Sequence, residues 1–113
     1  MTQLAQKQCT PCKGGVEPLK SEEILSHVEQ LQAGWSVVDG HHLEREFSFD
    51  NFRQGLEFVN KVGELAEQEQ HHPNILLTYD KVVVHLWTHK IDGLHENDFI
   101  LAAKIDAIRP EQS

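Results

Sequence analysis

Two adjacent histidines followed by a proline, His71-His72-Pro73, are the residues of this chain best suited to chemistry. A third histidine, His89, follows a strongly strand-forming segment farther along the chain. Histidine is the one side chain whose ordinary pKa lets it both donate and accept a proton near neutral pH. Three histidines that meet in one place, without an obvious set of metal ligands, predict proton-transfer chemistry.

Glu67 precedes His71 by four residues, so the two side chains share one side of a helix if that helix continues as far as His71. A carboxylate in that position would orient the imidazole. Two imidazoles that face one cavity could then act as proton donor and proton acceptor for a single substrate. The spacing alone leaves open the alternative that these histidines are surface or capping residues at a polar helix end.

Metal binding is a weaker interpretation of the histidines. His85 and His89 have the i, i+4 spacing that chelates zinc on a helix, but they lie on an expected strand, where four residues span roughly 13 Å. The pair Cys9-x-x-Cys12 would need two further ligands to hold zinc, so reduced thiols, a metal site and a redox site all stay open there. His41-His42 lies beside a hairpin turn and is expected to be solvated. We therefore expect no catalytic metal and no cofactor.

The elements that would position these residues follow from hydrophobic periodicity and turn residues. They are helices at 21–33, from Asp50 to His72 at most, and at 96–108, with strands at 35–38, 43–49, 74–78 and 81–89. Ser21 and Asp50 are the expected N-terminal caps of the first two helices. Asp39-Gly40 is a strong hairpin signal, and Pro73 must end the second helix. The order α-β-β-α-β-β-α predicts a two-layer α+β fold, in which three helices cover one face of a four-stranded antiparallel sheet.

Length and composition set the remaining expectations. The 113 residues predict one domain over 1–113, with an irregular lead-in at 1–20 and a polar tail at 109–113. The strand at 81–89 is apolar on both faces, which indicates burial on both sides and hence a homo-oligomer. A formal net charge of -8 argues against nucleic-acid binding. Without a secretory signal or the ~20 apolar residues of a membrane-spanning helix, the chain is expected to be cytoplasmic, with no membrane partner.

At the histidine motif the sequence resembles the pterin-4a-carbinolamine dehydratase family. The matching residues are Glu67-x-x-x-His71-His72-Pro73, Tyr79-Asp80-Lys81-Val82, Thr88-His89, Gly93-Leu94, Asp98 and Leu101-Ala102. The resemblance extends over nearly the whole chain, including the lead-in Cys9-x-x-Cys12-x-Gly-Gly. It implies an α+β homodimer or homotetramer that removes water from 4a-hydroxytetrahydropterin to give quinonoid dihydropterin. This reaction regenerates the cofactor of aromatic amino acid hydroxylases.

Carried onto this chain, the resemblance implies three active-site histidines, which are His71, His72 and His89. His71 and His89 would form the acid–base pair, in an order that the sequence leaves open. His72 would bind the pterin ring and the leaving oxygen. The resemblance implies neither a metal nor a redox cofactor.

The resemblance also implies supporting residues around the histidines. Glu67 and Asp98 would orient the histidines and stabilise their charge, and Thr88 would anchor the pterin or a histidine. His95 stands before the last helix, where a Ser or Thr cap is common, so the helix start is expected to be weaker by about 1 kcal/mol. Asp98 is for this reason the least firmly placed of the expected site residues.

Other functions stay open on the same fold. Some animal members of the family also act as coactivators by binding the dimerisation helices of a transcription factor, and a degenerate relative could serve in assembly or scaffolding. A metalloprotein built on Cys9, Cys12 and histidines is a further alternative. The presence of all three motif histidines favours the enzyme. The sequence specifies neither the pterin side chain nor the choice between dimer and tetramer.

Overall fold

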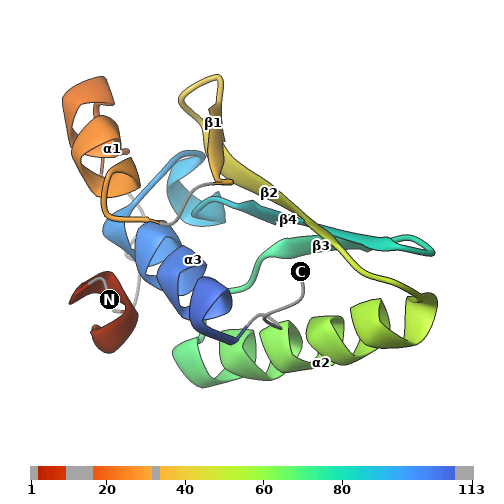
Figure 1. Cartoon of the computed structure of the whole chain (residues 1–113). Coiled ribbons are helices and arrows are strands. Elements are labelled where there is room, and N and C mark those ends of the chain that lie inside the picture. Colours follow the sequence, from red (N-terminus) through yellow and green to blue (C-terminus); the bar gives the residue numbers. More distant parts are fainter. Residues whose placement is uncertain (1–2, 10–16, 32–33, 109–113) are drawn as a thin grey trace.

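The computed structural model describes residues 3–9, 17–31 and 34–108 (Figure 1). Its elements are the 3₁₀ helix η1 (Gln3–Gln6), α1 (Ser21–Val28), β1 (Ser36–Val38), β2 (His42–Ser48), α2 (Phe52–Glu69), β3 (Asn74–Leu77), β4 (Lys81–Leu86), the 3₁₀ helix η2 (His89–Ile91) and α3 (Glu96–Ile108). The strands form one antiparallel sheet in the order β1-β2-β4-β3, and the three α-helices lie on one side of it (Figure 1). The expected two-layer α+β arrangement is confirmed. No helix among the described residues is both long and apolar enough to span a membrane.

The turn between β1 and β2 is built by two residues with a left-handed backbone. Asp39 and Gly40 have φ values of 54° and 65°, the pair of positive values that a type I′ hairpin turn requires. The backbone N–H of His41 donates to the carbonyl of Val38 at 2.9 Å and closes the turn. The hairpin predicted from Asp39-Gly40 is therefore present.

The central strands β2 and β4 divide the sheet into two faces, because alternate residues of a strand point to opposite sides. The face toward the helices is buried and carries Leu43, Phe47, Val82, Val84 and Leu86. The opposite face, called the outer face below, is only partly covered: Val83 is half-buried and Leu76 is 55% exposed. On the outer face β4 carries Val83 between Lys81 and His85, so this face is mixed and not apolar throughout as predicted. The oligomer inferred from the pattern stays a prediction.

The helix α3 is buried on nearly all sides. Nine of its 13 residues are buried, because it packs against η1, α1 and α2 as well as lying beneath the sheet (Figure 1). Leu4 of η1 is 1% exposed and belongs to the same core. The lead-in was expected to be irregular, but it contains this helical turn. Cys12 and the expected tail at 109–113 lie outside the described residues.

The first two helices begin one residue away from their expected caps. Ser21 is the first residue of α1, and Lys20 occupies the capping position. Asn51, and not Asp50, caps α2: its side-chain oxygen accepts the backbone N–H of Gln54 at 2.9 Å. Both expected caps were therefore wrong by one position. At α2 the neighbours Asp50 and Asn51 offer equivalent oxygen acceptors to a sequence pattern. At α1 the side chain of Lys20 makes no capping hydrogen bond, and the carboxylate of Glu23 instead accepts the backbone N–H of Lys20 at 3.0 Å.

Two elements end earlier than the periodicity predicts. α1 ends at Val28, before the expected 33. β4 ends at Leu86, because Thr88 pairs with Gly93 in an isolated bridge that folds the chain back. His89 therefore lies on η2, inside this loop, and is not the last residue of a strand as predicted.

The charges inside the core are paired. Arg45 lies on the inner face of β2, and its guanidinium donates to the carboxylate of Asp106 on α3 at 2.8 Å. The indole N–H of Trp35 donates to the same carboxylate at 2.9 Å. A Cβ on Gly34, whose φ is +117°, would lie 2.8 Å from Arg45 Nε. Only glycine leaves room for this network, which ties the start of β1 and the middle of β2 to α3.

Candidate active site

Asp98 is the buried centre of the candidate site. It is the third residue of α3, and its side chain is 0% exposed. Its Oδ1 lies 2.6 Å from Nε2 of His71, and its Oδ2 accepts the hydroxyl of Thr88 at 2.9 Å and the backbone N–H of His95 at 2.9 Å. Both carboxylate oxygens therefore have partners, as a buried polar group requires.

His95 caps α3 with its imidazole. Its Nδ1 accepts the backbone N–H of Asn97 at 3.1 Å, while its own backbone N–H donates to Asp98. This reciprocal pattern is a capping box in which histidine takes the place of Ser or Thr. The expected loosening of Asp98 is not what the geometry shows, because the imidazole nitrogen replaces the missing hydroxyl oxygen and Asp98 completes the box.

Glu67 and His71 do not meet, contrary to the prediction from their spacing. α2 ends at Glu69, and Gln70 adopts a left-handed conformation with φ of 54°. The chain therefore leaves the helix before His71, whose ring turns to Asp98. Glu67 instead contacts His72, with 2.5 Å between Oε2 and Nε2. Both side chains of this pair are more than half exposed, so the solvent weakens their attraction.

The structure brings His71, His72 and His89 to one pocket of about 220 Å³. The other residues that line the pocket are Gln70, Trp87, Thr88 and Lys90. The volume lies below the roughly 300–1,000 Å³ of pockets that enclose drug-sized ligands. The pocket could hold a small planar ring, with one edge of the ring exposed to solvent.

Trp87 lines the pocket but was not among the site residues expected from the sequence. Its ring centre lies 4.5 Å from that of His89, at an interplanar angle of 59°. Its position two residues before His89 was the available signal. Tyr79, which belongs to the matching motif, is exposed in the turn between β3 and β4 and is not among the lining residues.

His41 and His42 are not simply solvated, as was expected. Both are half-buried, and their rings lie 5.4 Å and 5.8 Å from that of Trp87. Burial, and then the neighbouring His85 and His41, lower the pKa of His42 below its ordinary value. The second histidine pair is therefore part of a packed group beside the pocket.

Cys9 is a free thiol anchored beside α2 and α3. Its backbone N–H donates to Glu69 Oε1 at 2.8 Å, and its Sγ lies 3.6 Å from the carbonyl oxygen of Asn97. Burial first, and then the charge of Glu69, raise the pKa of Cys9 to about 12. A thiol in this state is a poor nucleophile at neutral pH.

Comparison with known proteins gives these residues a context. The family model for pterin 4 alpha carbinolamine dehydratase matches residues 17–108. A relative from Rubrobacter xylanophilus is 56% identical over 108 residues, which cover 96% of this chain and 100% of that protein. A relative from Alkaliphilus metalliredigens is 51% identical over 111 residues, which cover 98% of this chain and 100% of that protein. Both are named provisionally as pterin-4-alpha-carbinolamine dehydratases.

Two solved structures share the fold. The crystal structure of a transcriptional coactivator/pterin dehydratase from Brucella melitensis has a TM-score of 0.77 and 33% identity, and covers 83% of this chain and 100% of its own. A pterin dehydratase-like protein, identified as a RuBisCO assembly factor in the alpha-carboxysome, has a TM-score of 0.58 and 24% identity over 67% of this chain and 89% of its own, which shows the fold alone. The family match and full-length relatives with more than half of their residues identical show that this chain belongs to the pterin 4 alpha carbinolamine dehydratase family.

Proposed function

We propose that this protein removes water from 4a-hydroxytetrahydropterins to give quinonoid dihydropterins, and that its pocket histidines carry the proton transfers. The observation that carries the proposal is that His71, His72 and His89 line one pocket, with the buried Asp98 behind His71. Membership of the family supports the substrate class. No cofactor is needed for the chemistry that follows.

The reaction requires one proton to be delivered and another to be removed. The C4a hydroxyl leaves as water once it has gained a proton, and the C4a–O bond breaks. The proton on N5 departs as the C4a=N5 double bond forms, so the sum is the loss of one water molecule. One imidazolium and one imidazole meet both needs.

His71 is the more rigid member of the acid–base pair. Its Nε2 faces Asp98 at 2.6 Å, so the ring exchanges protons with the substrate through Nδ1. Asp98 acts as a positioning residue, in the way that a third group orients the base in other acid–base sites. Thr88 and His95 hold Asp98 in turn.

His89 and His72 occupy the more exposed part of the pocket. His89 packs against Trp87 and serves as the second member of the acid–base pair. His72, paired with Glu67, contacts the pterin ring and the leaving oxygen. Both side chains remain able to adjust when the substrate enters, because they are exposed.

The test is the rate of dehydration of freshly generated 4a-hydroxytetrahydropterin. Wild type should exceed the spontaneous rate, and folded His71→Ala and His89→Ala should each lose about 10²–10⁴-fold of the acceleration. His27→Gln on α1, outside the pocket, is the matched control and should keep the wild-type rate. A folded wild type that gives no acceleration would contradict the proposal and favour a binding or assembly role.

We further propose that the protein is a homodimer or homotetramer in the cytoplasm. Leu76 and Val83 are opposite each other on the outer face, and these apolar side chains support contact between copies. Light scattering of the purified chain would give the mass. A monomer at micromolar and higher concentrations would contradict the assembly but leave the dehydratase proposal standing.

A further inference from the structure

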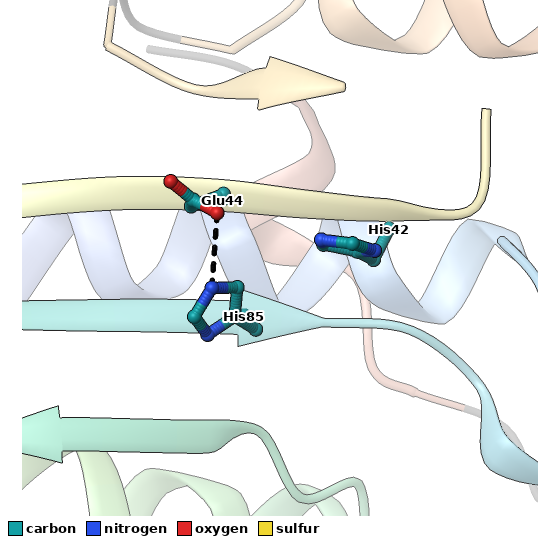
Figure 2. Close-up of side chains that lie close together, drawn as sticks. All are labelled: His42, Glu44 and His85. Atoms are coloured by element: carbon teal, nitrogen blue, oxygen red, sulfur yellow. Dashed lines mark hydrogen bonds and ion pairs between the residues drawn. The ribbon is translucent and has the colours of Figure 1, made fainter. Parts of the chain in front are cut away.

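A second histidine cluster lies on the outer face of the sheet, away from the pocket's acid–base residues. His42 and Glu44 are two residues apart on β2, so their side chains project from the same face. His85 on β4 stands opposite Glu44 in the strand register. Figure 2 shows the three side chains together, and one possible ligand atom from each lies within 4.8 Å of the others.

We propose that His42, Glu44 and His85 bind a divalent transition-metal ion, with zinc as the best match. Two imidazoles and a carboxylate are ligands that zinc takes in proteins, and three protein ligands leave one position for water. All three residues are half-buried, so the site is reachable from solvent. This ion takes no part in the proposed dehydration, which uses the histidines of the pocket.

The distances suit a tetrahedral ion after a small adjustment. Zinc–ligand bonds of 2.0–2.2 Å place two ligand atoms roughly 3.4 Å apart. Nε2 of His85 and Oε1 of Glu44 are 3.0 Å apart, so an ion between them would replace the present hydrogen bond with little movement (Figure 2). The widest separation in the cluster must shrink by at most about 1.4 Å, which side-chain rotation can supply.

A chain of hydrogen bonds presents His42 to the ion in the required form. Nε2 of His41 lies 2.8 Å from Asp92, so His41 donates there and keeps Nδ1 as an acceptor. Nδ1 of His42 lies 3.1 Å from that acceptor, so His42 donates through Nδ1 and keeps a lone pair on Nε2. Carboxylate–histidine partners of this kind orient the ligands of metal sites.

An ordinary cross-strand ion pair does not account for the cluster. Such a pair occurs close by, where Glu46 and Lys81 lie 3.6 Å apart on the same face with no histidine between them. Glu44 and His85 differ from it because a second imidazole, oriented by its own partners, stands beside them. Glu46 therefore provides a matched control for Glu44 on the same strand and the same face.

The first experiment is calorimetric titration of the full chain with zinc chloride. Wild type should bind one ion per chain. His42→Gln, Glu44→Gln and His85→Gln should each weaken binding by at least ~100-fold, since even the loss of an orienting partner typically gives 10–100-fold. His41→Gln should fall in that smaller range, and Glu46→Gln should bind as wild type does. Circular dichroism would establish that each variant is folded.

Two other sites could hold zinc, and the same titration separates them. A Cys9→Ser/Cys12→Ser double variant removes the thiols, and His72→Gln alters the pocket. Both should keep wild-type zinc affinity. Loss of binding in either of them, unchanged binding in the three cluster variants, or no stoichiometric binding by folded wild type would overturn the proposal.

The fluorescence of Trp87 gives an independent test of where the ion binds. The ring of Trp87 lies 5.8 Å from that of His42, so bound Cu²⁺ should quench its fluorescence. The quenching should disappear in His85→Gln and persist in Glu46→Gln. Quenching that survives in His85→Gln would place the ion elsewhere and contradict the assignment.

Discussion

In the pocket, His71 is 10% exposed and contacts an Asp98 carboxylate that is 0% exposed. Outside the pocket, His85 and His41 contact Glu44 and Asp92, whose side chains are 43% and 88% exposed. The first imidazole cannot turn without breaking a buried network, whereas the others can rotate at small cost. The difference matches the two roles proposed for histidine: a fixed ring suits proton transfer to a placed substrate, and an adjustable ring suits an ion that draws its ligands together.

The largest effect should come from removing the charge of the buried partner. Asp98→Asn should lower kcat by about 10³-fold, since an amide no longer fixes the tautomer and charge of His71. Steady-state kinetics would show the loss in kcat more than in KM, together with an altered pH–rate profile. Glu67→Gln, which alters the exposed partner of His72, should stay within about fivefold, or ~1 kcal/mol. Equal losses in the two variants would break the distinction between buried and exposed partners.

Cys9 extends the same comparison from imidazoles to thiols. The rise of its pKa from the ordinary 9.0 to about 12 lowers the thiolate fraction near pH 8 about a thousandfold. In Cys12→Ser protein, iodoacetamide should therefore modify Cys9 about a thousand times more slowly in the folded state than in urea. Because only the thiolate reacts, the rate should keep rising with pH beyond 9. A difference below tenfold would show that burial does not control this thiol.

The two faces of β2 allow a buried ion pair and an exposed ion pair to be compared by their effects on the free energy of unfolding. Arg45→Leu removes the guanidinium that faces the buried carboxylate of Asp106, to which the indole of Trp35 also donates, and should reduce the free energy of unfolding by about 3 kcal/mol. Lys81→Gln removes the exposed partner of Glu46 and should change it by less than about 1 kcal/mol. Urea denaturation measures both. An Arg45→Leu protein as stable as Lys81→Gln would mean that the buried pair contributes no more than a surface one.

The smallest effect concerns the imidazole cap of α3. His95→Ala should lower stability by about 1 kcal/mol, because the backbone N–H of Asn97 loses its acceptor. His95→Ser should restore it, since a hydroxyl oxygen can accept the same bond. Thermal denaturation of the two variants compares them directly. Unchanged stability in His95→Ala would show that the ring nitrogen is not a working cap.

Local patterns were enough to predict the elements of the fold. The signals used were apolar residues at helical spacing, the turn residues Asp39-Gly40 and the helix-ending Pro73. Each depends on interactions between neighbours in the chain, and the helices and strands that they predicted are present. The contact of His71 with Asp98 could not be predicted in this way, because it depends on the left-handed Gln70 that ends α2. The three histidines were selected from their residue type and position, and the family resemblance added the supporting residues Thr88 and Asp98. The helical spacing paired Glu67 with His71, whereas Glu67 contacts His72.

Contacts between residues far apart in the chain could not be predicted from the sequence pattern. Glu44 and His85 are 41 residues apart and meet only because β2 and β4 pair in one register. Leu4 fills the core from a single helical turn, which is too short to show periodicity. In both cases the information lies in how elements pack and not in any one of them.

The carboxylate of Asp98 closes the first turn of α3 and also holds His71. Fraying of that turn should therefore also release His71 from its position in the pocket. Heating that frays the turn should abolish the proposed dehydratase activity at a temperature below that at which the sheet unfolds. Over the same temperature range, hydrogen exchange of the His95 backbone amide should become faster. The exchange rate of the His95 amide would thus report the fraction of molecules with an ordered pocket, although His95 does not line that pocket.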